Sequence, residues 1–182
     1  MFKSLYINEY ELTNKQETIE IIIYSVVSFF LPFIIGHPQY LVGALVNSLL
    51  IISAMNIKGY KLLPIIIAPS LGALTQGLLF GPFTIFLVYM APFIWIGNAV
   101  LVYCFKYFKL TKKMNYWLTL LIGSITKAVF LFIIAYILYS LNIIPVIFLT
   151  AMGIIQLVTA ISGGVIAYIF NFLKNKVIPS LS

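Results

Sequence analysis

The sequence contains no arginine and no aspartate, and its only acidic side chains are four glutamates. All four lie within the first twenty residues, at Glu9, Glu11, Glu17 and Glu20. A catalytic site or metal site built from paired carboxylates therefore cannot form in the remainder of the chain. We predict no catalytic residues, and we expect the protein not to be an enzyme.

Other kinds of site also lack their residues. The single cysteine, Cys104, excludes an internal disulfide and a CxxC motif. The single histidine, His37, has no second type of metal ligand nearby in the sequence, so it is either an exposed loop residue or a cap on a pocket. No HExxH motif and no glycine-rich phosphate loop occurs. We expect no metal or cofactor, and without a phosphate loop the chain cannot itself use ATP.

Long hydrophobic runs fill most of the chain. Of its 182 residues, 63% are hydrophobic and 8% are charged, against about 25% charged residues in typical soluble domains. The composition predicts an all-α integral membrane protein, with about 20 apolar residues for each crossing. Six segments fit: 19–35, 40–57, 62–80, 83–107, 116–140 and 145–173. Residues 1–18 are polar and lack the apolar core of a cleavable signal peptide, so we expect the first segment to remain as an anchor.

The lysines predict how these segments cross the membrane. Ten of the eleven stand before the first segment, or at or beyond the ends of the second, fourth and sixth: Lys3 and Lys15; Lys58 and Lys61; Lys106, Lys109, Lys112 and Lys113; Lys174 and Lys176. Positive charge favours the cytoplasmic side of short membrane loops. We therefore predict a cytoplasmic segment at 1–18, a six-helix transmembrane domain at 19–174, and a cytoplasmic tail at 175–182. Both termini are cytoplasmic in this topology, and the location is the cell membrane.

The net charge of +7 does not indicate nucleic-acid binding, because the lysines are scattered between apolar segments. We interpret them as topology signals and as contacts for anionic lipid, each contributing about 1 kcal/mol near the surface.

The eleventh lysine, Lys127, lies inside the fifth segment. It follows Tyr116 by eleven residues, which places it about 16 Å deep at 1.5 Å per residue. A lysine at a helix centre costs about 2.5–3.5 kcal/mol on insertion scales, and no segment contains an acidic partner at that depth. An anionic ligand group would meet this need. Alternatively, backbone carbonyls solvate the ammonium, or a tilted helix brings it to a headgroup.

Several other polar residues can converge with Lys127 in one small-molecule pocket. They are Asn47, Gln76, Asn98, Gln156 and Thr159. Trp95 and Tyr89 share the fourth segment with Asn98 and are predicted to supply an aromatic wall. For each of these polar residues the alternative is an ordinary hydrogen bond between helices.

Three stretches carry a resemblance to a known family. They are GHPQYLVGALVN at 36–47, APSLG at 68–72 with FGP at 80–82, and PFIWIGN at 92–98. Glycine- and proline-rich outer loops that lead into a Trp-x-Gly-Asn segment resemble the substrate-binding S component of energy-coupling factor transporters. The resemblance extends over nearly the whole chain in architecture. One departure is that the first segment has only Ser25 and Ser28 where many members carry Ala-x-x-x-Ala.

This resemblance implies uptake of a vitamin or similar micronutrient across a prokaryotic plasma membrane. The substrate would bind in a pocket lined by the outer loops and segments four to six. It also implies two kinds of partner, namely a membrane T component and two cytoplasmic ATP-binding subunits. Two alternatives remain open: a solitary small-molecule carrier, and a structural or assembly protein of the membrane without a ligand.

Overall fold

The computed structural model describes residues 2–9, 12–36, 38–77 and 81–177, and this part of the chain forms helices without strands. The long helices are α1 (Asn14–Ile35), α2 (Gln39–Asn56), α3 (Leu63–Gln76), α4 (Thr84–Cys104), α5 (Tyr116–Ser140) and α7 (Ile154–Val177). The short ones are η1 (Phe2–Tyr6), η2 (Gly59–Leu62), η3 (Gly81–Phe83), η4 (Phe105–Thr111) and α6 (Ile147–Met152). The all-α prediction is confirmed.

Five helical stretches are long and apolar enough to cross a membrane. They are Asn14–Ile35, Gln39–Asn56, Gly81–Thr111, Tyr116–Ser140 and Ile147–Lys174, and they identify a multi-pass membrane protein. The 14 residues of α3 span about 21 Å, less than a hydrocarbon core of about 30 Å. The predicted segment 62–80 ends in residues 78–80, which lie outside the described part. Six crossings and cytoplasmic termini remain predictions.

Local signals set most of the helix ends. Helix α1 begins at Asn14 rather than at residue 19, because Thr13 and Gln16 form a capping box that supplies partners for the first amides. Helix α3 ends where Gly77 adopts a left-handed conformation, with φ at 73°. Helix α5 has the predicted bounds, since the Asn115 side chain accepts from the backbone N–H groups of residues 117 and 118.

Two predicted segments are interrupted within the structure. The sixth, predicted to be continuous over 145–173, breaks at Gly153 into α6 and α7. A Cβ at Gly153 would stand 2.8 Å from the carbonyl oxygen of Leu149, so glycine permits the tight break. The fourth segment continues beyond Cys104 as the π-helix η4. The break at Gly153 introduces no charged residue, so the apolar composition of the sixth segment did not reveal it.

Three of the prolines lie inside helices. Pro32 is in α1, Pro69 in α3 and Pro92 in α4. Pro64 instead occupies the first turn of α3. Proline suits that position, because the N–H it lacks would have no partner within the helix.

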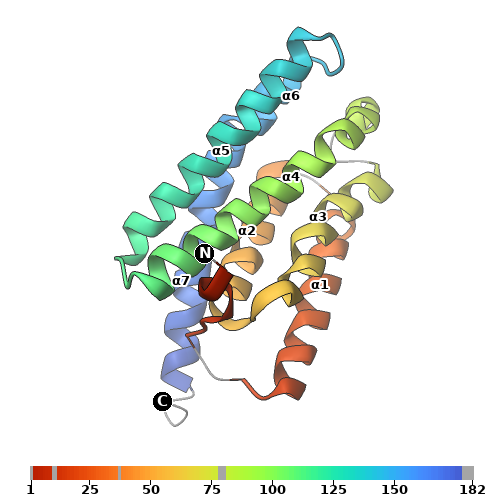
Figure 1. Cartoon of the computed structure of the whole chain (residues 1–182). Helices are drawn as coiled ribbons and strands as arrows, with labels where there is room; N and C mark the ends of the chain where they lie inside the picture. Colours follow the sequence, from red (N-terminus) through yellow and green to blue (C-terminus); the bar gives the residue numbers. More distant parts are fainter. Residues whose placement is uncertain (1, 10–11, 37, 78–80, 178–182) are drawn as a thin grey trace.

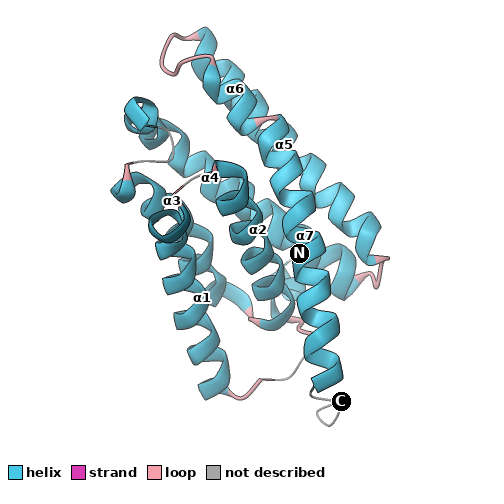
Figure 2. Cartoon of the chain, turned by 180° about the vertical axis from the view of Figure 1, so that it is seen from behind, coloured by secondary structure: helices cyan, strands magenta, loops and turns pink. Residues whose placement is uncertain are grey.

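Helix α2 forms the centre of the bundle. It packs most extensively on α7, and α1 packs on α3. Figures 1 and 2 show α1 and α3 side by side on one flank, with α5 and α7 on the other. At the α2–α7 contact, a Cβ at Gly163 would lie 2.5 Å from the carbonyl oxygen of Ala44. The small residue therefore allows the two backbones to touch.

The predicted lysine groups gather at one end of the bundle, which we call the lysine-rich end. There the Lys61 ammonium lies 2.6 Å from a Glu17 carboxylate oxygen, and Lys174 lies 3.5 Å from Glu20. The opposite end carries the α1–α2, α3–α4 and α5–α6 connections (Figure 1), and we call it the loop end.

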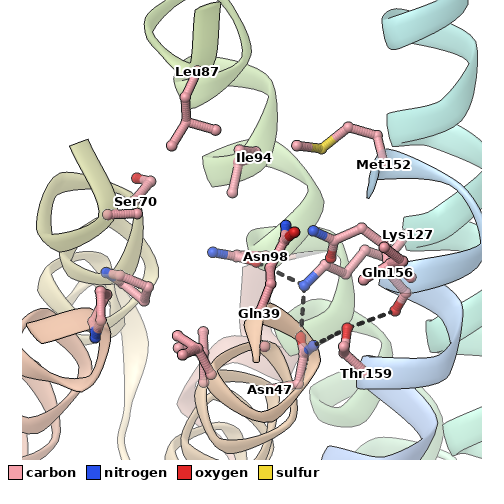
Figure 3. A pocket seen from close by; sticks show the side chains of 17 residues that line it. Gln39, Asn47, Ser70, Leu87, Ile94, Asn98, Lys127, Met152, Gln156 and Thr159 are labelled. Atoms are coloured by element: carbon pink, nitrogen blue, oxygen red, sulfur yellow. Dashed lines mark hydrogen bonds between the residues drawn. The ribbon is translucent and has the colours of Figure 1, made fainter. Parts of the chain in front are cut away.

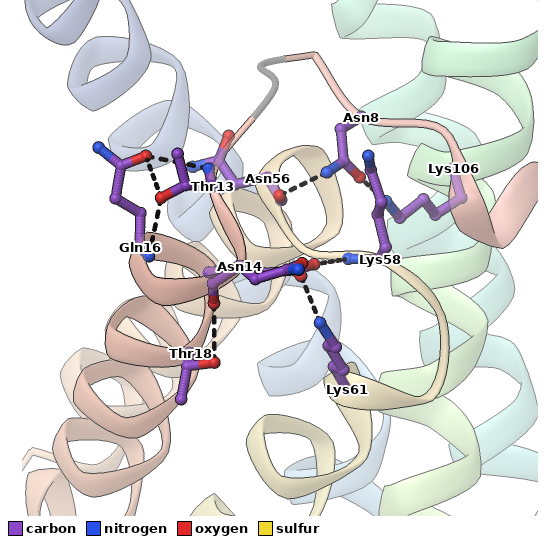
Figure 4. A network of polar contacts seen from close by, with 10 residues as sticks. Asn8, Thr13, Asn14, Gln16, Thr18, Asn56, Lys58, Lys61 and Lys106 are labelled. Atoms are coloured by element: carbon purple, nitrogen blue, oxygen red, sulfur yellow. Dashed lines mark hydrogen bonds and ion pairs between the residues drawn. The ribbon is translucent and has the colours of Figure 1, made fainter.

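Part of the predicted cytoplasmic segment 1–18 covers the lysine-rich end (Figure 4). Asn8 donates to the carbonyl oxygen of Asn56 at 2.8 Å, and the Glu9 N–H donates to that of Met55. The ammonium of Lys106 is fully buried and donates to the Ile7 carbonyl at 2.6 Å and to Asn8 Oδ1 at 3.0 Å. The sequence predicts contacts with anionic lipid for the lysines of this group. Lys106 differs from that prediction, because its buried ammonium anchors the N-terminal segment.

Candidate ligand-binding site

A cavity of about 100 Å³ lies between α2, α3, α4, α5 and α7, and Pro32 of α1 and Met152 of α6 each add to its lining. Its polar lining residues come from five helices: Gln39, Asn47, Ser70, Asn98, Lys127, Gln156 and Thr159 (Figure 3). Asn47 and Lys127 lie near the middle of their helices, whereas Gln39 is the first residue of α2 and Gln156 the third of α7. The cavity therefore extends from the middle of the bundle toward the loop end.

Lys127 lines this cavity at the middle of α5, and the residue is only 2% exposed. Its Nζ donates to Asn47 Oδ1 at 2.6 Å and to Asn98 Oδ1 at 2.8 Å. Neither sequence-based alternative for Lys127 describes this arrangement. The ammonium reaches neither a headgroup nor backbone carbonyls, because two side-chain amides bind it inside the bundle.

Both amides are held with their oxygens toward Lys127. Asn47 Nδ2 donates to Thr159 Oγ1 at 3.2 Å, and the Thr159 hydroxyl donates to the Gln156 carbonyl at 3.2 Å. Asn98 Nδ2 donates to the Ile66 carbonyl on α3 at 3.0 Å. With their N–H groups engaged elsewhere, the asparagines present acceptors to the cation. This network places two dipoles around the ammonium, without a side chain of opposite charge among the described residues.

No described carboxylate pairs with Lys127. The two ion pairs found among the described residues both lie at the lysine-rich end, and they use Glu17 and Glu20. An ammonium has three N–H donors, and the two asparagines accept two of them. The third is available to a group that enters the cavity. The site can therefore bind an acceptor, and a negatively charged acceptor best of all.

Of the predicted site residues, the structure brings Lys127, Asn47, Asn98, Gln156 and Thr159 together around this cavity.

The other predicted site residues lie elsewhere. The Trp95 indole N–H donates to the hydroxyl of Ser70, which lines the cavity, so Trp95 supports the wall from behind. Gln76 lies at the loop end beside Gly36. Tyr89 is 54% exposed and faces away. His37 lies outside the described residues.

The position of Tyr89 follows from helix geometry. The α4 residues that line the cavity are Leu87, Ile94 and Asn98, which share one face at intervals of seven and four residues. Tyr89 is two positions from Leu87, on the opposite side of the helix. The predicted aromatic wall is therefore wrong: the apolar lining residues are aliphatic, such as Val42, Val46 and Met152.

Sequence reasoning missed several lining residues, including Pro32, Gln39 and Ser70. A signal for two of the lining positions was present. Pro32 and Pro69 each interrupt a helix, and such interruptions are tolerated where a cavity or a neighbouring helix satisfies the freed backbone. Both prolines line the cavity.

Among the described residues, no three His, Cys, Asp or Glu side chains cluster as a metal site requires. Comparisons of the chain with protein-family models, curated proteins and solved structures found no match.

Proposed function

We propose that this chain is the membrane-embedded substrate-binding subunit of an uptake system for a vitamin or similar small micronutrient. In this proposal a membrane T component and two cytoplasmic ATP-binding subunits supply the energy. One observation carries the ligand-binding part: Lys127 lies in a cavity at mid-bundle with two amide oxygens as partners and no described carboxylate.

The electrostatics of this site favour a ligand with an acidic or acceptor-rich group. An ammonium removed from water loses several kcal/mol of hydration, which neutral amides compensate only in part. A ligand oxygen that accepts the third N–H of Lys127 forms a charge-assisted hydrogen bond, with a net contribution of about 1.5–3 kcal/mol. Such a ligand supplies the negative charge that no described carboxylate provides to Lys127.

The rest of the cavity constrains the shape of the ligand. Its walls are aliphatic around Val42, Leu87 and Ile94, and Gln39 and Gln156 add amide groups nearer the loop end. We expect a compact molecule whose acidic group lies at Lys127 and whose apolar part contacts these walls. A flat aromatic ligand would find no aromatic face among the described lining residues.

The direction of access agrees with uptake. The cavity extends toward the loop end, which the predicted topology places outside the cell. At the lysine-rich end, the contacts of Asn8 and Lys106 hold residues 7–9 across the bundle. Substrate would therefore enter from outside and would need a conformational change for release inward.

Mass spectrometry of the purified protein tests the ligand proposal. We expect a small molecule with an acidic group to be retained by the unchanged protein and by the control Lys112→Met, which changes an exposed lysine. In Lys127→Met, retention should fall about tenfold or more, the equivalent of about 1.4 kcal/mol. A folded Lys127→Met protein that retains the molecule as well as the control would refute the pocket.

A solitary carrier is the second candidate, and the first helix favours it. Ser28, one of the small residues at the position of the expected docking pattern, is fully buried and cannot form an outer docking surface. Affinity purification from native membranes distinguishes the two. Co-purification of one further membrane protein and two ATPases supports the proposed subunit, whereas transport by the chain alone in ATP-free vesicles supports the carrier.

A further inference from the structure

A second cavity, of about 170 Å³, lies at the lysine-rich end between the N-terminal segment, α2, η4, α5 and α7. It is lined by Glu9, Met55, Lys109, Tyr116, Tyr168, Asn171 and Phe172, none of which lines the first cavity. A single water needs about 10–15 Å³ of such space, so this cavity can hold a larger group. Neither the topology nor the proposed function explains it.

Asn171 gives the first indication of a ligand. The residue is only 7% exposed, and its Oδ1 has no hydrogen-bond partner among the described residues. Its Nδ2 donates only to the sulfur of Met55, at 3.3 Å, which is a weak acceptor. A buried amide oxygen is normally hydrogen-bonded. Asn171 therefore gives the wall of this cavity a buried acceptor without a donor among the described residues.

Two side chains of opposite charge line this cavity without forming an ion pair with each other. Glu9 and Lys109 both line it, yet no ion pair within 4.0 Å links Glu9 to another described residue. A ligand that carries both signs can satisfy both, with its cationic end at Glu9 and its anionic end at Lys109. A purely anionic ligand would meet Lys109 but would bring a like charge toward Glu9.

Aromatic rings that line the cavity also favour a cationic group. The Tyr116 and Tyr168 rings lie 5.2 Å apart, and Trp117 lies 5.0 Å from Tyr168. The Tyr116 hydroxyl donates to the Gly164 carbonyl at 2.7 Å, which fixes its ring. Aromatic faces attract ammonium groups, with a contribution of about 0.5–2 kcal/mol.

We propose that this cavity binds a primary ammonium joined to a phosphate, as in the headgroup of a phosphatidylethanolamine lipid. The ammonium donates to Asn171 Oδ1 and to the Glu9 carboxylate beside the tyrosine rings, and the phosphate lies against Lys109. Phe172 is 53% exposed beside the cavity, where acyl chains can continue along α7. A quaternary choline headgroup fits less well, because it has no N–H to donate to Asn171. This inference does not depend on the proposed transport function.

Native mass spectrometry of the delipidated, full-length protein tests the proposal. The probes are the dihexanoyl forms of phosphatidylethanolamine, phosphatidylcholine and phosphatidylglycerol, together with free phosphoethanolamine. We expect phosphatidylethanolamine to bind about tenfold more tightly than the other two lipids, as expected for a charge-assisted hydrogen bond. Comparable binding of phosphoethanolamine would support the headgroup site and identify a soluble source of the same chemistry.

Variants separate this site from a generally basic surface. Glu9→Gln should weaken phosphatidylethanolamine binding about fivefold or more while strengthening phosphatidylglycerol binding, because it removes the like charge. Lys109→Gln should weaken both, and the exposed Lys112→Gln should change neither. Asn171→Leu should weaken the binding of phosphatidylethanolamine but not that of phosphatidylglycerol. If this buried substitution impairs folding, Glu9→Gln and Lys109→Gln alone decide the result.

Three outcomes would overturn the headgroup proposal. Equal binding of phosphatidylglycerol and phosphatidylethanolamine would show a basic surface without headgroup recognition. Unchanged binding of phosphatidylethanolamine by Glu9→Gln would show that the ammonium does not bind at Glu9. Absence of binding by every probe would show that the cavity does not bind a headgroup of this kind.

Discussion

At Lys127 the chain stabilises a buried ammonium with neutral groups. Asn47 and Asn98 direct their oxygens at the cation, and each uses its own N–H group elsewhere. A carboxylate would have balanced the charge and left no need for a ligand. Two amides instead make burial tolerable while preserving the positive potential of the cavity. This is the electrostatic condition that a binding site for acidic molecules requires.

A double-mutant cycle measures this arrangement. Lys127→Met and Asn47→Leu should each lower the free energy of unfolding in mixed micelles by about 1–3 kcal/mol, because each leaves a buried polar partner unsatisfied. The double variant should lose less than the sum, with a coupling of about 0.5–3 kcal/mol.

The control pairs Lys127→Met with Ser140→Ala, at an exposed position near the end of α5. These two changes should add within about 0.5 kcal/mol. Additivity in the first pair as well would show that the Lys127–Asn47 bond contributes nothing.

At the scale of elements, the contact between α2 and α7 positions the site. A Cβ at Gly163 would lie 2.5 Å from the Ala44 carbonyl oxygen and 2.8 Å from the Ser48 nitrogen. Backbone atoms cannot move aside as a flexible side chain can. Asn47 and Thr159 bond across this same contact, so the close approach of the two helices also sets the geometry around Lys127.

Gly163→Ala should therefore destabilise the protein by about 1–3 kcal/mol and weaken ligand retention at Lys127. Gly123→Ala is the matched control, because its new Cβ would meet the Leu101 and Cys104 side chains at 3.1 Å and 3.3 Å. We expect a smaller effect there, since side chains can shift and alanine favours the helix by about 1 kcal/mol. Thermal unfolding of both variants checks this, and equal losses would contradict it.

The N-terminal segment is a second element whose position rests on few contacts. Lys106→Met would leave the Ile7 carbonyl and Asn8 Oδ1 without their cationic donor. We expect the backbone amides of residues 4–9 to exchange hydrogen faster, by a factor corresponding to about 1–3 kcal/mol.

Hydrogen-exchange mass spectrometry makes this measurement, with Lys112→Met as the exposed control. Unchanged protection in Lys106→Met would show that the Asn8–Asn56 and Glu9–Met55 bonds suffice to hold the segment.

At the scale of the whole molecule, the two ends of the bundle differ in chemistry. One end gathers lysines, two ion pairs and the N-terminal segment, and the other carries short, nearly uncharged connections. The cavity around Lys127 extends toward the loop end. This polarity makes the orientation in the membrane decisive for any transport role.

Cysteine labelling of intact cells tests that orientation. In a Cys104→Ala background, Leu141→Cys at the loop end should react with a membrane-impermeant maleimide, and Lys112→Cys should react only after lysis. Both positions have negative φ angles, at −86° and −87°, unlike the left-handed Asn142 and Lys113. The reverse pattern would invert the topology, and labelling of both in intact cells would exclude six crossings.

The sequence by itself determined the membrane class, the bounds of α5 and the acid-free surroundings of Lys127. These features are local: runs of apolar residues fix helix length, and charge resists the hydrocarbon. Only the tertiary structure decided that Asn47 and Asn98, 80 and 29 residues from Lys127, bind it. It alone placed Tyr89 outside the pocket and buried Lys106. The reason is that helices in lipid are apolar on every face, so the pattern along each one does not reveal which side meets its neighbours.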